Sequence, residues 1–120
     1  MGNSLVKAMG AGTLLQVLMV VVGHYLPASQ QAGLFPIAGT LIGLVTGWLA
    51  GKGIPGAEIG SVAATGGIAG AGAGILGSLV STALGDVPVG NVGIAGGSTL
   101  VMGALGGILA KYLGGRAQAQ

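Results

Sequence analysis

Few residues in this chain could perform acid–base, metal or nucleophilic chemistry. Among its 120 residues there is one histidine, His24, two carboxylates, Glu58 and Asp86, and no cysteine. A metal site needs several histidines, thiolates or clustered carboxylates, and a disulfide or thiolate site needs cysteine. A proton relay through His24 would need a partner such as Asp86. Because no nucleophile–base pair or metal cluster is recognisable, we expect no enzymatic activity, no metal and no cofactor.

The other polar side chains lie inside long apolar segments. Gln16 is the most informative, because an amide buried in lipid needs a partner and can join two helices. A place in a pore or ligand site is the alternative for Gln16. Hydroxyls at such depths usually bond back to carbonyls of their own helix. This group comprises Thr40, Thr46, Ser61, Thr65, Ser78, Ser81, Ser98 and Thr99.

The composition defines the class of protein in which these residues are placed. Hydrophobic residues make up 52% of the chain, charged residues only 5%, and 28 residues are glycine. Soluble domains carry about 25% charged residues, so a soluble monomer is excluded. A disordered linker lacks apolar surface, which this chain has in excess. The four basic residues are too scattered for a nucleic-acid patch. An integral membrane protein remains.

Four segments are long and apolar enough to span a bilayer, which takes about 20 residues of helix. They cover residues 8–26, 34–51, 58–84 and 91–113, and a short polar tail follows at 114–120. Pro36 is expected in the first turn of the second helix, where its missing N–H costs nothing. The sequence therefore predicts an all-α fold, a four-helix bundle forming a single transmembrane domain over residues 1–120.

The charges indicate one orientation for these four spans. With four spans, the basic residues all fall on the side of the two termini: Lys7, Lys52, Lys111 and Arg116. Since basic residues near span ends are retained in the cytoplasm, both termini are expected there. Three aromatic residues at span ends are interpreted as interface anchors: Tyr25, Trp48 and Tyr112. His24 is interpreted as part of an interfacial pair with Tyr25.

The glycines recur at four-residue spacing, which places them on nearly the same helix face. The predicted packing residues are Gly39, Gly43, Gly47 and Gly51 in the second span, Gly66, Gly70 and Gly74 in the third, and Gly103 and Gly107 in the fourth. Small residues let helices in lipid approach closely. These small-xxx-small faces could hold one bundle together. Alternatively, one face could receive another subunit, a lipid tail or a second copy.

Two spans differ in the bulk of their side chains. The first, 8–26, is rich in Leu, Val and Met, and we expect its bulky side, including Val20, to face lipid at the edge of the bundle. The third, 58–84, is small on nearly every side, which favours a central position with neighbours all around it.

The segment Gly43–Lys52, with Gly47-Trp48-Leu49-Ala50-Gly51-Lys52 as its most specific part, precedes two glycine-rich spans. In this it resembles the transglycosylase-associated or stress-response family of small bacterial membrane proteins, over about residues 39–115. The resemblance implies a bacterial inner (cytoplasmic) membrane. It carries no catalytic residues over to this chain.

Two functions follow as hypotheses. The first is a small accessory or structural membrane subunit that packs through its glycine faces against itself or a larger membrane complex. The alternative is a homo-oligomeric channel or small-solute carrier. The expected partners are membrane lipid and a larger complex or a homo-oligomer, with no nucleic acid.

Overall fold

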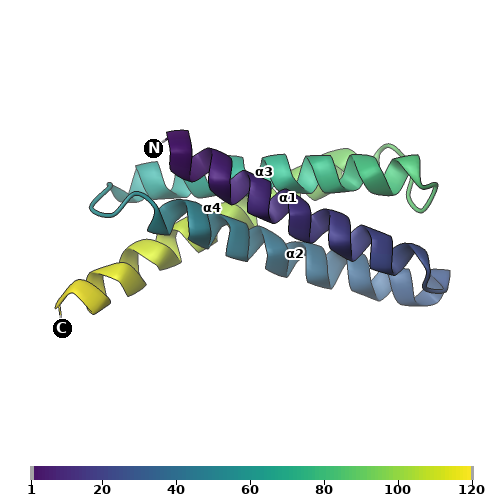
Figure 1. The fold of residues 1–120 in the computed structure, drawn as a ribbon, viewed down its shortest axis with the longest axis horizontal. Coiled ribbons are helices and arrows are strands. Elements are labelled where there is room, and N and C mark those ends of the chain that lie inside the picture. Colours follow the sequence, from purple (N-terminus) through teal and green to yellow (C-terminus); the bar gives the residue numbers. More distant parts are fainter. Residues whose placement is uncertain (1, 120) are drawn as a thin grey trace.

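The computed structural model describes residues 2–119, and over this range the chain forms four α-helices and no strand (Figure 1). They are α1 (Gly2–His24), α2 (Ala28–Lys52), α3 (Ile59–Ala83) and α4 (Asn91–Ala119). Each contains a stretch long and apolar enough to cross a membrane. The expectation of an all-helical chain with four such helices is confirmed.

The helices run alternately up and down, so the two termini lie at the same end of an elongated bundle of 47 × 24 × 18 Å (Figure 1). Within the described range, α2 and α3 each contact the three other helices, whereas α1 and α4 do not meet. The bundle is therefore rhombic in section, with α2 and α3 across its short diagonal. The central position expected for the third span is occupied by α3, and α2 shares it.

The contact between α2 and α4 is a backbone-to-backbone approach. A β-carbon built at Gly47 would overlap the backbone of Gly103, and one at Gly51 would lie 2.8 Å from the Cα atom of Gly107. One turn away, a β-carbon at Gly43 would lie 3.0 Å from the Thr99 side chain. Successive pairs advance by one turn on both helices, so α2 and α4 run parallel.

The contact between α3 and α4 is equally close. A β-carbon at Gly66 would overlap the carbonyl oxygen of Gly103, and one at Gly70 would overlap that of Thr99. At Gly74 it would meet the Thr99 side chain and lie 3.0 Å from the Ala95 oxygen. Gly103 thus lies where α2, α3 and α4 meet.

Gly39 differs from the three glycines that follow it at four-residue spacing. A β-carbon there would make only ordinary contacts, at 3.7 Å from Gln16 and 3.8 Å from Met19 on α1. A four-residue step turns a helix by about 400°, so each step shifts the ladder by about 40° around the axis. Gly39 has consequently turned away from α4 and toward α1.

The second helix starts earlier than predicted. The residues between the first two predicted spans, 8–26 and 34–51, include the first turn of α2, which begins at Ala28. Pro27 has φ −59°, a value suited to a helix start, and the alanine and glutamines that follow are good helix formers. Pro36 therefore lies inside α2, not in its first turn as predicted, and it leaves the Ala32 carbonyl without its usual N–H donor.

Two further boundaries and one exposed face differ from expectation. α1 begins at Gly2 instead of residue 8, and α4 continues to Ala119, beyond the expected end at residue 113. The side chains of the predicted polar tail, 114–120, lie outside the part of the chain that the structure describes. Val20 is only 2% exposed, so its expected contact with lipid is wrong: it lies on the inner side of α1.

Candidate functional site

A cavity of about 400 Å³ lies in the half of the bundle near the α1–α2 turn and the α3–α4 loop. All four helices contribute to its wall. Its polar lining includes Gln16, Gln31, Ser78, Ser81, Asp86 and Asn91. Its volume is in the range of small-molecule sites in proteins.

The cavity exists because α2 and α4 diverge toward this end. They touch from Gly51 to Gly43, but the next glycine of α2, Gly39, faces α1 and leaves no small surface for α4. Pro36 and Ile94 line the cavity from the two diverging helices, and both are exposed. In the opposite half of the bundle, the glycine contacts close the space between α2 and α4.

The end of α3 positions Asp86. Gly85 has φ +81°, a left-handed conformation that favours glycine, and its N–H donates to the Thr82 carbonyl at 3.0 Å. The Asp86 N–H donates to the Ser81 carbonyl at 3.1 Å, which completes a Schellman motif. This local geometry turns the chain so that the Asp86 side chain reaches the rim of the cavity.

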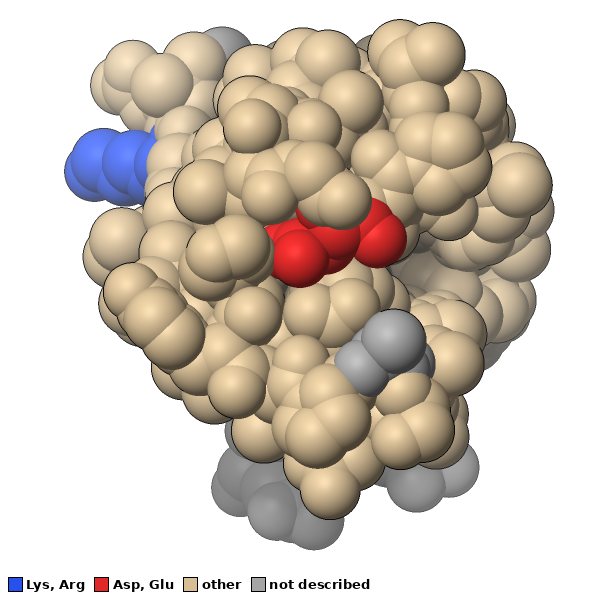
Figure 2. Space-filling view, turned by 90° about the vertical axis from the view of Figure 1, so that its right-hand side faces the viewer, with Lys and Arg blue, Asp and Glu red and all other residues tan. Residues whose placement is uncertain are grey.

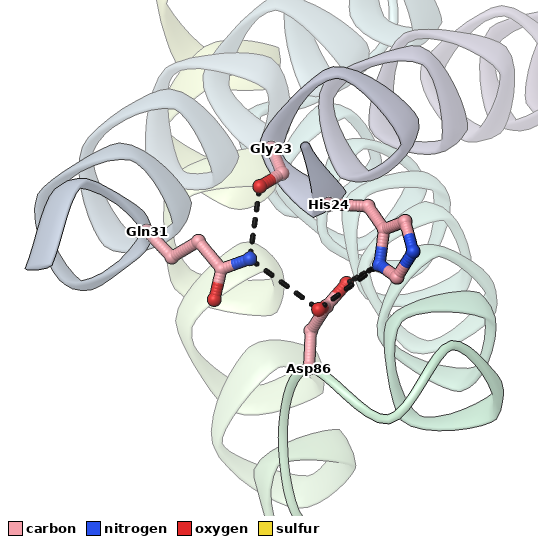
Figure 3. Close-up of polar contacts among 4 residues, drawn as sticks. All are labelled: Gly23, His24, Gln31 and Asp86. Carbon is pink, nitrogen blue, oxygen red and sulfur yellow. Dashed lines mark hydrogen bonds and ion pairs between the residues drawn. The ribbon is translucent and has the colours of Figure 1, made fainter. Parts of the chain in front are cut away.

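Asp86 joins the two helical hairpins at this rim (Figure 3). Its carboxylate oxygens lie 3.1 and 3.0 Å from Nδ1 of His24, at the end of α1. Because a carboxylate only accepts, Nδ1 must carry the proton in this contact. The Gln31 amide donates both to Asp86 at 3.3 Å and to the Gly23 carbonyl at 2.9 Å. The Asp86 carboxylate, in the loop between α3 and α4, therefore accepts hydrogen bonds from both helices of the α1–α2 hairpin, through His24 and Gln31.

The surroundings of this network are nearly free of charge. The Asp86 side chain is 10% exposed and that of His24 is 37% exposed. Figure 2 shows a small acidic patch at this end of the molecule, with other residue types around it and basic residues only at the left edge of the view. The polar partners of the Asp86 carboxylate are therefore His24 and Gln31 of the same chain.

Gln16 also lies at the cavity wall and is 3% exposed. Its Nε2 donates to the Gly39 carbonyl at 3.3 Å, and its aliphatic part occupies the space that a side chain at Gly77 would need. The structure therefore places Gln16 in a contact that joins α1 to α2 and α3, and also beside the cavity.

The buried hydroxyls fall into two groups. The Thr46 and Thr99 hydroxyls donate to carbonyls four residues earlier, at 2.7 and 2.6 Å, and Thr40 bonds Pro36 in the same way, as expected from the sequence. By contrast, the Oγ atom of Ser81 and the Oγ1 atom of Thr65 are buried without a hydrogen-bond partner. Only Ser81 of these two lines the cavity.

The predicted interface anchors lie at the two ends of the bundle and outside the cavity. Tyr25 is 83% and Tyr112 is 59% exposed. Trp48 is half-buried, and the Lys52 ammonium lies 4.7 Å from the centre of its ring. Lys111 donates to the Ala57 carbonyl at 2.7 Å and so ties α4 to the α2–α3 connection.

Sequence reasoning missed Gln31 and Asn91 as cavity residues. Gln31 lies between the first two predicted spans, and Asn91 is the first residue of the fourth predicted span and of α4. In the structure the Asn91 amide also donates to Ser78 at 3.4 Å. A usable signal was available: Gln31, Asp86 and Asn91 are polar residues next to span ends on one predicted side. Among the described residues, no group of three or more potential metal ligands occurs.

Comparisons with family models, curated proteins and solved structures found no match for this chain. The resemblance over residues 39–115 therefore stays a prediction from those residues alone.

Replacing Asp86 by alanine should destabilise the bundle by about 1–2 kcal/mol, because His24 and Gln31 lose their shared acceptor. Unfolding by dodecyl sulfate, followed by circular dichroism, measures the loss. The matched control is the other acid, Glu58→Ala. Glu58 is exposed and makes no side-chain cap bond to α3, so its replacement should change stability by less than about 0.5 kcal/mol. Equal losses for the two acids would contradict a structural role for the Asp86 network.

Proposed function

We propose that this chain is an integral membrane protein whose four helices cross the bilayer with both termini in the cytoplasm. Large apolar side chains exposed along the bundle support insertion, among them Leu14 at 61%, Ile37 at 66% and Val101 at 59%. The distribution of charge supports the orientation, since lysines lie near the end that carries the termini and Asp86 lies at the other. The family resemblance adds a bacterial inner membrane to this proposal.

The helices are held together, in this proposal, by backbone approach at glycine. In lipid no hydrophobic force draws helices together, so close van der Waals contact must supply the attraction. The contacts of Gly47 and Gly66 with Gly103 are of this kind. Because these glycine faces meet helices of the same chain, they support a self-contained bundle.

Within this frame, the function is binding of a small molecule in the outer half of the membrane by a non-enzymatic subunit. The observation that carries this proposal is the cavity of about 400 Å³ with polar groups in its wall, which lies toward one end of the bundle, whereas glycine contacts bring α2 and α4 together toward the other end. A conducting path through a single chain would have to pass the glycine contacts between α2 and α4. The channel alternative would therefore need a pore between several copies.

An accessory role remains the second candidate, and one observation favours it. Gly93 and Gly97 on α4 are exposed, and a β-carbon at either position would meet no atom within 4 Å. This pair is a small face that the chain's own helices leave open. A larger complex or a second copy would contact the bundle there, and not through Gly43 or Gly47.

The binding function predicts that protein purified in mild detergent retains a non-covalently bound small molecule, detectable by native mass spectrometry. Gly39→Leu should remove it, because the new side chain enters the cavity while its β-carbon meets only ordinary contacts. Gly33→Leu on the same helix should retain it, since Gly33 is exposed with open space around it.

Absence of any bound molecule from the wild-type protein, or equal retention by the two leucine variants, would contradict the binding function. Ion flux through protein-containing liposomes above that of empty vesicles would favour the channel alternative instead.

A further inference from the structure

The polar groups of the cavity indicate an uncharged ligand. Asp86 is the one formally charged side chain among the described residues of the wall, and its carboxylate already accepts from His24 and Gln31. Among the residues that the structure describes, no lysine or arginine lines the cavity, so its wall offers no permanently positive side chain to neutralise a phosphate or a carboxylate. The remaining polar groups are hydroxyls and amides, which can donate as well as accept hydrogen bonds.

Ser81 identifies where such a ligand would bind. Ser81 is one of the residues that line the cavity, it is only 3% exposed, and its Oγ atom is buried with no hydrogen-bond partner. A buried hydroxyl without a partner costs free energy, and a ligand hydroxyl would remove that cost. The Ser78 hydroxyl and the Asn91 amide, 3.4 Å apart, also line the cavity and provide further partners for a head with several hydroxyls.

The rest of the wall indicates that the ligand also has an apolar part. Met19, Phe35 and Pro36 line the cavity from α1 and α2, and Ile94 lines it from α4. Ile94 is 69% exposed, at the edge where α2 and α4 diverge. The opening between these two helices lies along the apolar side of the bundle. A chain attached to the ligand head can therefore extend through it into lipid.

We propose, on the basis of the binding function above, that the cavity takes one uncharged amphiphile with a hydroxylated head, of the monoacylglycerol type. The head reaches Ser81, and the acyl chain leaves between α2 and α4 into the outer leaflet. Anionic lipids are disfavoured because the Asp86 carboxylate lies in the wall, and the basic side chain beside it, His24, is already paired with that carboxylate.

The test uses the full chain in phosphatidylcholine nanodiscs, with one tryptophan as the reporter. Ile94→Trp combined with Trp48→Phe places that tryptophan at the cavity edge, where exposure leaves room for it. Dibrominated monoacylglycerol should quench its fluorescence to saturation at low mole fraction, and unbrominated monoacylglycerol should reverse the quenching. Dibrominated phosphatidate should produce only the gradual, unsaturable quenching of a bulk lipid.

Ser81→Ala should weaken the saturable binding by about fivefold to tenfold, the effect of one lost hydrogen bond. The matched control is Thr65→Val, which removes another unpartnered buried hydroxyl, outside the cavity, and should leave binding unchanged. Both variants lose a hydroxyl without a partner, so neither should unfold more readily than the parent protein.

Four results would each overturn this ligand class. Two concern the lipids: unsaturable quenching by every lipid, or equal saturation by phosphatidate. The other two are displacement by free glycerol as effective as that by monoacylglycerol, and equal effects of the two hydroxyl variants. The binding function would stand or fall separately, because the mass of the retained molecule in the wild-type protein tests it without assuming any ligand class.

Discussion

Gly103→Ala should destabilise the bundle by about 2 kcal/mol or more, although alanine is the better helix former. A β-carbon at this position would overlap the Gly66 carbonyl oxygen and lie 3.1 Å from the Cα atom of Gly70. Both obstacles are backbone atoms of α3, which cannot rotate away, so α4 must move from its neighbour. Forcing one carbon into a close-packed contact costs about 1–3 kcal/mol and sometimes more. Dodecyl sulfate titration of the purified protein measures the effect.

The control is Gly97→Ala on the same helix, and it should act in the opposite direction. Gly97 is exposed and has no atom near its missing side chain, so alanine adds helix propensity, up to about 1 kcal/mol, without a clash. Equal tolerance of alanine at positions 97 and 103 would refute close glycine contact as the source of stability.

Single cysteines should be labelled from opposite sides of the membrane, in an all-or-none pattern. The chain has no cysteine, so each variant carries one reactive thiol. In intact cells a membrane-impermeant maleimide should label Ser29→Cys, at the start of α2, but not Glu58→Cys, before α3. Glu58→Cys should react only after permeabilisation. Both native residues are exposed, so access to either thiol depends on the side of the membrane.

Leu18→Cys tests whether the apolar surface faces lipid. Leu18 is 53% exposed in the second half of α1, so in water a thiol at this position would react readily. In a bilayer a charged reagent should not reach it from either side. Reaction of Leu18→Cys at the rate of Ser29→Cys would end the membrane proposal. Labelling of Ser29→Cys and Glu58→Cys from one side would end the four-span topology.

Several features of the fold were predictable because they depend on local composition. A run of apolar residues about 20 long satisfies its own backbone hydrogen bonds as a helix, so the number of helices could be read without knowing any neighbour. The boundaries were less predictable. The segment before Leu34 is polar, but Pro27 and the residues after it start a helix all the same.

The candidate site was predictable only in part. His24 and Asp86 lie near the ends of the first and third predicted spans, which the four-span topology puts on the side opposite the termini, and the structure places them 3.0 Å apart. Their contact depends on the Schellman turn at Gly85 and on the packing of α1 against α3, and neither follows from spacing. Ser81 could not be distinguished from the other hydroxyls, because the sequence does not show which of them bond back to their own helix, as Thr40, Thr46 and Thr99 do.

By itself, the sequence determined the class of structure: four apolar helices, small faces on three of them and basic residues toward one side. These are properties of single segments, because hydropathy and glycine spacing require no knowledge of a neighbour. The tertiary structure decided which face each glycine meets. The ladder of α2 shifts by about 40° at each step, so Gly43, Gly47 and Gly51 face α4 while Gly39 faces α1. It is this divergence, a property of two helices together, that opens the cavity and places Ser81 in its wall.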